Sequence, residues 1–220
     1  MRRHYDLVAK AVEQPEADVL PEIFSAAARV PRARDTQAST AVLLVNGFNG
    51  LGLATLTRVA RLFGSEFINI VFVRVGEIDS ALLRGPDEIR QLEQQITDDL
   101  LEYCTLAANL GFHAELRTTI GSDVVLELQR LCLEVVQEFP KAVFFAGQLV
   151  FSDERESYFS RFLHNHTAME LLRWLQLRGL SLLILAIRVA LPKDSVEPTR
   201  RRTDIGKTDF DTSLLPAAGN

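Results

Sequence analysis

Apolar residues in this chain fall into short continuous runs separated by longer segments with a helical period. Short uninterrupted apolar runs are typical of strands buried on both faces, as in parallel sheets covered by helices. Four segments have this character and are predicted to be buried strands: Ala41–Val45, Phe67–Val73, Ala142–Ala146 and Leu180–Ile187. In His113–Ile120 apolar and polar residues alternate, which predicts a half-exposed strand at a sheet edge.

Helical periodicity fills the intervals between these runs. A helix over Leu53–Phe63 is predicted to end at Gly64, because glycine is the usual residue just past a helix end. A longer helix is predicted to begin at Pro86 and to end at Gly111. Its buried stripe should consist of residues spaced by threes and fours, namely Ile89, Leu92, Ile96, Leu100, Tyr103, Ala107 and Leu110.

Polar residues mark the starts and the outer faces of the helices. Ser122 is predicted to cap the helix that follows it, and Thr167–Glu170 matches a capping box for the last helix. The acidic residues Asp98, Asp99 and Glu102 are expected on the solvated side of the long helix. Strands and helices then alternate along the chain, which predicts an α/β fold with right-handed crossovers and a doubly wound parallel sheet.

The ends of the chain differ from its middle in composition. Residues 1–40 are predicted to be an N-terminal helical segment and linker, residues 41–191 an α/β domain, and residues 192–220 a polar tail. The length of 220 residues suits one domain with such extensions.

Charge and cysteine content narrow the class of protein. The formal net charge of −5 argues against nucleic acid as the partner, because binding to phosphate backbones needs clustered Lys and Arg. Cys104 and Cys132 lack metal-ligand spacing and are interpreted as reduced core thiols. The first residues are not those of a signal peptide, and no apolar run approaches the roughly 20 residues that cross a bilayer. A soluble, cytoplasmic chain is therefore expected.

Two loops are candidates for ligand binding. In open α/β sheets, ligands bind beyond the carboxyl ends of the strands, where the strand order reverses. The loop Asn46–Gly52 follows the first strand, and the loop Gly147–His166 follows the fourth. A tight strand-to-helix turn explains the first loop more simply, since its glycines match neither the dinucleotide fingerprint nor the P-loop. The candidate ligand-binding residues are Asn46, Gly47, Asn49, Gly50, Gly147, Gln148 and Asn165.

No spacing in the sequence specifies a catalytic or metal site. His164 and His166 could begin a metal site, but a helix cap and a surface residue explain them more simply. Ser152, Asp153 and His164 could form a triad on paper, without a nucleophile elbow. We therefore expect no catalytic residues, no metal and no enzymatic activity.

Three stretches carry a family resemblance: Ala41–Leu56, Phe72–Ser80, and Phe139–Phe151 with Phe162–Ala168. Together they resemble the cytoplasmic C-terminal domain of bacterial permeases in the amino acid–polyamine–organocation superfamily. The resemblance implies a regulatory or assembly domain attached to, or associated with, a transmembrane permease domain. It would place the chain at the cytoplasmic face of the inner membrane.

The same segments resemble the universal stress protein fold, which implies a five-stranded parallel sheet with strand order 3-2-1-4-5. Members that bind ATP carry an acidic residue where this chain has Asn46, and a Gly-x-x-Gly stretch where it has Gly147 and Val150. Their later Gly-Ser or Gly-Thr step corresponds to His164–Asn165. We therefore expect no cofactor, with a small-ligand or nucleotide sensor as the alternative function.

Self-association is expected from the two edges of such a sheet. The resemblance places both His113–Ile120 and Leu180–Ile187 at edges. The second segment has no charged residue, so its exposed backbone would form an apolar ribbon. A homodimer with Leu180–Ile187 at or near the interface is expected.

Overall fold

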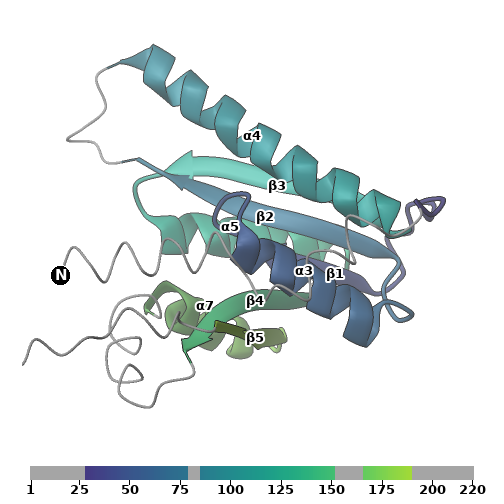
Figure 1. Cartoon of the computed structure of the whole chain (residues 1–220). Helices are drawn as coiled ribbons and strands as arrows, with labels where there is room; N and C mark the ends of the chain where they lie inside the picture. Colours follow the sequence, from purple (N-terminus) through teal and green to yellow (C-terminus); the bar gives the residue numbers. More distant parts are fainter. Residues whose placement is uncertain (1–27, 79–84, 152–165, 190–220) are drawn as a thin grey trace, which may run out of the picture.

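The computed structural model describes residues 28–78, 85–151 and 166–189. Five parallel strands form one sheet in the order β3-β2-β1-β4-β5, which confirms the predicted doubly wound architecture. The strands are β1 (Thr40–Leu44), β2 (Asn69–Glu77), β3 (His113–Gly121), β4 (Ala142–Phe151) and β5 (Leu182–Val189). Figure 1 shows the sheet between two layers of helices.

The helices α3 (Gly50–Phe63) and α4 (Pro86–Asn109) cover one face of the sheet, and α5 (Val124–Glu138) and α7 (His166–Gln176) cover the other. Alternate residues of each central strand point to opposite faces. Leu43 and Phe72 therefore enter the core beneath α3 and α4, whereas Val42 and Val71 enter the core beneath α5 and α7. Burial on both faces explains the continuous apolar runs in the sequence.

The predicted helical stripes are largely confirmed. In α4 the buried residues include Ile96, Leu100, Tyr103 and Ala107, all from the predicted stripe. The helix ends in a Schellman motif, in which Phe112 N donates to Ala107 O (3.1 Å) and Gly111 adopts φ 94°.

The predicted end of the first helix is confirmed, because α3 ends at Phe63 with Gly64 as its C-cap, although Gly64 has φ −62° and is not left-handed. Two predicted helix starts are wrong. Asp123, not Ser122, caps α5, because its side chain accepts a hydrogen bond from Leu126 N at 3.0 Å. Thr167 lies inside α7, which begins at His166, so the predicted capping box does not start that helix.

Several boundaries differ because strands and helices extend past their apolar segments. The first helix begins at Gly50 rather than at Leu53, since the cap is Asn49. β2 and β4 continue to Glu77 and Phe151, where pairing with the neighbouring strand supports residues that the apolar pattern leaves out.

Candidate functional site

The loop between β1 and α3 contains the first group of predicted site residues. Asn46 is exposed, Gly47 and Asn49 are half-buried, and Gly50 is buried in the first turn of α3. Gly47 has φ +86°, a conformation that side-chain-bearing residues rarely adopt. The structure thus brings these four residues together at the carboxyl end of β1, as predicted.

Asn49 uses its whole side chain to close this loop. Its Oδ1 accepts a hydrogen bond from Gly52 N at 3.0 Å, and its Nδ2 donates to Asn46 O at 2.8 Å. Its carbonyl oxygen accepts the first helical bond, from Leu53 N, at 3.0 Å. Asn49 is therefore the N-cap of α3, and one of the helix amides that an anion could bind is already occupied.

Tyr103 of α4 holds the same loop by hydrogen bonds. Its hydroxyl donates to Gly47 O at 3.0 Å and accepts from Asn49 N–H at 3.2 Å. Its ring is fully buried, stacks on Phe72 with centroids 5.1 Å apart, and meets Phe48 edge-on at 4.9 Å. Burial raises the pKa of Tyr103 to about 12, so the hydroxyl stays protonated at neutral pH.

Gly52 makes this arrangement possible. A Cβ at Gly52 would lie 1.9 Å from the Tyr103 hydroxyl oxygen and 2.7 Å from the ring carbon that bears it. No side chain fits at this position while Tyr103 holds the loop. The contribution of Gly52 is therefore room for a tyrosine, not close approach to a ligand.

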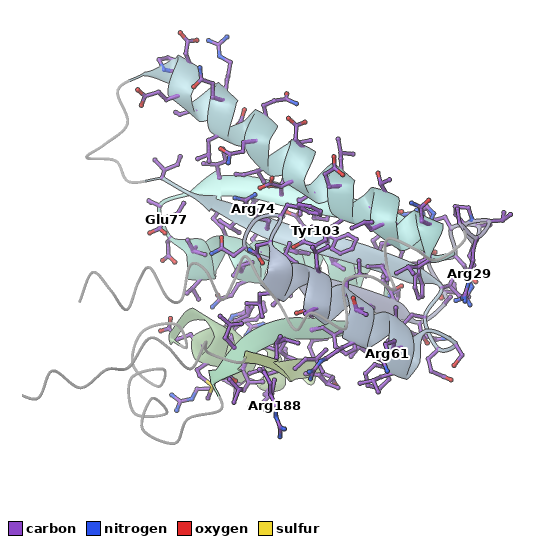
Figure 2. All side chains as sticks on the ribbon, viewed as in Figure 1. Arg29, Arg61, Arg74, Glu77, Tyr103 and Arg188 are labelled. Carbon is purple, nitrogen blue, oxygen red and sulfur yellow. The ribbon has the colours of Figure 1, made fainter. Side chains whose placement is uncertain are left out.

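An ion pair lies beside the loop. Arg74 of β2 donates through Nη1 to Asp99 Oδ2 of α4, and the side chains are 13% and 25% exposed. A Cβ at Gly47 would lie 3.7 Å from Arg74 Nη2 and 3.8 Å from Asp99 Oδ2, so the pair borders the loop directly. Figure 2 shows Arg74 and Tyr103 between the sheet and α4.

The position of Asp99 corrects the sequence prediction. Asp98 and Glu102 are exposed as expected, but Asp99 points inward to Arg74. A charged residue next to another acid on a helix gives no sign of its partner, because Arg74 lies 25 residues away in an otherwise apolar strand. The signal that sequence reasoning missed was an arginine between two valines directly after the apolar run Phe67–Val73.

Gly147 and Gln148, from the second predicted group, do not lie in a loop. Gly147 and Gln148 lie within β4 and pair with Leu185 and Ala186 of β5. A Cβ at Gly147 would lie 2.2 Å from Thr55 Oγ1 and 2.9 Å from Leu51 Cδ1, so this glycine lets α3 pack closely on the sheet. The prediction of a loop starting at Gly147 is wrong, because strand pairing continues to Phe151. Asn165, Ser152, Asp153 and His164 lie outside the described residues.

The described residues offer little conventional chemistry. They contain no group of three or more His, Cys, Asp or Glu side chains that could hold a metal ion. Cys104 is half-buried and Cys132 is fully buried, and both are free thiols. Burial raises the pKa of Cys104 to about 11 and that of Cys132 to about 12, which disfavours the nucleophilic thiolate at neutral pH. Within the described ranges, no helix is both long and apolar enough to cross a bilayer.

Comparisons with known proteins add a structural likeness. No protein-family model matches the sequence, and no curated protein matches it. Among solved structures, the chain is similar to a protein of the universal stress protein family from Burkholderia pseudomallei. The two share 14% sequence identity with a TM-score of 0.48, and the match covers 70% of this chain and 98% of that one.

Proposed function

We propose that this chain is a non-catalytic regulatory or assembly domain of an amino acid or cation permease, located at the cytoplasmic face of the membrane. One observation carries the non-catalytic part of the proposal. The loop after β1, where a ligand or substrate is expected in such sheets, is held closed by hydrogen bonds from within the chain.

Binding of a nucleotide at this loop would need free amides and an available cation. Asn49 already accepts the Gly52 amide, and Tyr103 accepts the Asn49 amide. Arg74 is paired with Asp99, so its charge is largely neutralised before any ligand arrives. An incoming triphosphate would have to displace these contacts, which lowers its net affinity.

Close packing on the β4 side adds to this argument. The strand order reverses between β1 and β4, and ligand crevices in open α/β sheets form at such points. Here α3 lies directly against Gly147, with Thr55 and Leu51 at distances that exclude even a methyl group. Helix α3 therefore fills space at β4 that a ligand would need.

Attachment to a permease rests on the sequence resemblance alone. The residues that carry it include Asn46–Gly52 and Gly147, which have packing and capping roles in the structure. Residues retained for packing mark a shared scaffold more readily than a shared reaction. This reading fits a domain that acts through contacts with other parts of a transporter.

The permease proposal is tested on the native reading frame and on the full-length product. If membrane spans precede Met1, deletion of residues 1–220 should leave a transporter that still moves its substrate in proteoliposomes. Its regulation or its oligomeric state should change. Unchanged transport rate, regulation and oligomeric state, or a reading frame without membrane spans and no permease partner, would contradict the proposal.

A small-ligand sensor is the second candidate function, and one observation favours it. Arg74 Nε and Thr118 Oγ1 are buried and have no hydrogen-bond partner among the described residues. The two residues are paired across β2 and β3, next to the loop after β1. A nucleotide or another anion that opened the loop could satisfy both atoms. Such a ligand should contact Asn46, Gly47, Asn49 or Gly50.

We also propose a homodimer through the edge strand β5. Within the described chain, β5 pairs with β4 along one side only, and Ala186 and Arg188 are exposed. Leu183 and Leu185 pack partly against the core beneath α3, and Arg58 donates to Ala186 O. β5 extends past the predicted segment Leu180–Ile187 and includes Arg188. The exposed edge of this strand is therefore less apolar than the predicted segment alone.

Light scattering of the variant Ala186→Lys tests this dimer. The change places a charge on the exposed edge, whereas Thr105→Lys places one on the exposed face of α4 as a control. The wild type and the control should be dimers, and Ala186→Lys should be a folded monomer. A monomeric wild type, or a dimeric Ala186→Lys, would rule out this interface.

A further inference from the structure

A pocket of about 500 Å³ lies near the amino ends of the strands, at the other end of the sheet from the loop after β1. It is formed where α3 and α4 end and where the segment before β1 passes them. Ligand sites commonly enclose about 300–1,000 Å³, so the volume suits a small organic molecule. Its lining comprises Arg29, Arg32, Thr57, Ala60, Arg61, Leu62, Gly64, Ser65, Leu110 and Phe112, and we call it the arginine pocket.

The charged side chains that line this pocket among the described residues are all positive. Among the described residues that line it, three are arginines and none is Asp or Glu, in a chain whose net charge is −5. Figure 2 shows Arg29 and Arg61 at the end of the molecule where α3 and α4 finish, with Glu77 far from them. Guanidinium groups stay charged at any physiological pH, so the pocket is permanently cationic.

Part of this charge serves the fold. Helices α3 and α4 both end here, and each helix end carries roughly half a negative charge from its unpaired carbonyl groups. Arg32 donates through Nη1 to Gly64 O at 3.2 Å and to Phe67 O, and its guanidinium lies 5.6 Å from the centre of the Phe112 ring. The two helix ends therefore offset part of the positive charge of the pocket.

Arg29 has no such role in the fold. Its guanidinium forms no hydrogen bond or ion pair with any residue that the structure describes. Its backbone is fixed, however, because Arg29 N donates to Asn109 O at 2.9 Å and Arg32 N donates to Gly111 O at 3.2 Å. The two arginines are therefore presented from a backbone anchored to the end of α4.

A charge network anchors the same segment on its other side. Arg34 bonds to Glu115 Oε1 at 2.5 Å and to Glu138, and its guanidinium lies 5.2 Å from the centre of the Phe139 ring. Arg117 bridges the same two carboxylates at 2.8 and 2.6 Å. Anchoring at both ends reduces the ordering cost of any ligand that the segment binds.

The remaining lining is apolar. Ala60, Leu62, Leu110 and Phe112 contribute it, and Leu62 is 65% exposed although it is a large hydrophobic residue. A cavity that combines guanidinium groups with apolar walls fits an anion that carries an apolar body. Guanidinium forks match the geometry of phosphate oxygens, which accept paired hydrogen bonds.

We propose that the arginine pocket binds the phosphate group of an organic phosphate, with Arg29 and Arg61 at the phosphate and Leu62 and Phe112 against the apolar portion. The phosphate belongs either to a soluble phosphate ester or to a phospholipid headgroup, and both present the same chemistry. The site is separate from the loop after β1 and does not depend on the permease proposal.

Titrations of the full chain with inorganic phosphate and with phenyl phosphate, followed by NMR, test the soluble source. Phenyl phosphate should bind more tightly than inorganic phosphate and shift the amides of residues 60–65 and 110–112. The double variant Arg29→Gln/Arg61→Gln should weaken binding at least about tenfold, because each arginine supplies charged hydrogen bonds. Arg90→Gln, which removes an exposed charge near the start of α4, should change the affinity less than twofold.

Co-sedimentation with lipid vesicles tests the second source. If the phosphate is a headgroup, the wild type should bind phosphatidylcholine vesicles only when they contain phosphatidylglycerol, and the double variant should not bind them. Arg29→Gln alone, whose guanidinium forms no hydrogen bond or ion pair with the described residues, covers the case in which the double variant misfolds.

Three results would overturn the proposal. The first is that neither the soluble probes nor the anionic vesicles bind saturably. The second is that the arginine variants bind as the wild type does. The third is that phenyl phosphate shifts the amides of residues 46–52 in place of those lining the pocket.

Discussion

The carboxyl ends and the amino ends of the parallel strands differ in how nearby charges and backbone groups are paired. At the carboxyl ends, the loop after β1 is closed by Asn49 and Tyr103, and the nearby Arg74 is paired with Asp99. At the amino ends of the strands, Arg29 and Arg61 line an open pocket that has no carboxylate among its described lining residues. The glycine-rich loop is closed by hydrogen bonds from within the chain, whereas the opposite end, which has no sequence motif, is lined by arginines.

This difference teaches that a glycine-rich loop is not by itself a ligand site. Gly47 supplies a turn, Gly52 makes room for Tyr103, and Gly147 makes room for α3. Each role is structural.

The largest effect is expected from Gly52→Ala. In an ordinary helix this change would stabilise the protein by about 1 kcal/mol. Here the new methyl group would collide with the buried Tyr103, so we expect a loss of about 2–3 kcal/mol in the free energy of unfolding, measured in urea.

Gly121→Ala is the control for this experiment. Its new Cβ would lie 2.6 Å from Cγ of Glu127, and a flexible Glu side chain can move away. We expect a loss below about 1 kcal/mol. If Gly52→Ala were as stable as Gly121→Ala, Tyr103 would not hold the loop in the way described.

Tyr103→Phe should have a smaller effect. The ring contacts with Phe72 and Phe48 remain, but the hydroxyl that joins Gly47 O and Asn49 N–H is lost. We expect a loss of about 1–1.5 kcal/mol and faster hydrogen exchange at the Asn49 amide. Unchanged exchange at Asn49 would show that the loop is closed without Tyr103.

Glu115→Gln tests the anchoring of the segment that carries Arg29 and Arg32. Burial opposes ionisation of Glu115, but hydrogen bonds with His113, Arg34 and Arg117 outweigh it and lower its pKa from 4.5 to about 2. A pKa lowered by folding gives stability that is present above pH 4.5 and lost as the pH falls towards 2. Glu115→Gln should therefore cost about 1 kcal/mol at pH 7 and almost nothing near pH 2.

Urea unfolding between pH 2 and pH 7 measures this dependence. Glu134→Gln is the matched control, since its carboxylate is 48% exposed and lies 3.3 Å from Arg130. Its effect should be about 0.5 kcal/mol or less. A difference between wild type and Glu115→Gln that stays constant down to pH 2 would exclude the charge network as its cause.

Arg29→Gln should have the smallest effect on stability. The guanidinium forms no hydrogen bond or ion pair with the described residues, so the free energy of unfolding should change by less than about 0.5 kcal/mol. A loss above about 1 kcal/mol would mean that Arg29 serves the fold, and the contrast between the two ends of the strands would weaken.

Most of the fold was predictable because strands that are buried on both faces have continuous apolar sequences. Val42, Leu43, Val71 and Phe72 are adjacent apolar residues that enter opposite cores, which only a covered parallel strand allows. The alternation in His113–Ile120 correctly indicates an edge strand. The strand order itself came from the family resemblance, since periodicity does not specify which strands are neighbours.

The site was less predictable because its contacts join distant segments. Asn46, Gly47, Asn49 and Gly50 were grouped correctly, since they are adjacent in sequence. The Tyr103 hydroxyl reaches Asn49 across 54 positions, and no local pattern separates it from an ordinary core residue. Gly147 was placed in a loop because an apolar pattern does not show where strand pairing ends.

A calorimetric titration of Mg-ATP into the Arg29→Gln/Arg61→Gln variant tests the central claim most directly, because this variant removes the competing arginine pocket. The account holds that the loop after β1 is closed and binds no nucleotide. It predicts no saturable heat at millimolar Mg-ATP and no hydrolysis. Low-micromolar binding that is weakened by Asn46→Ala would contradict the account and favour a nucleotide sensor.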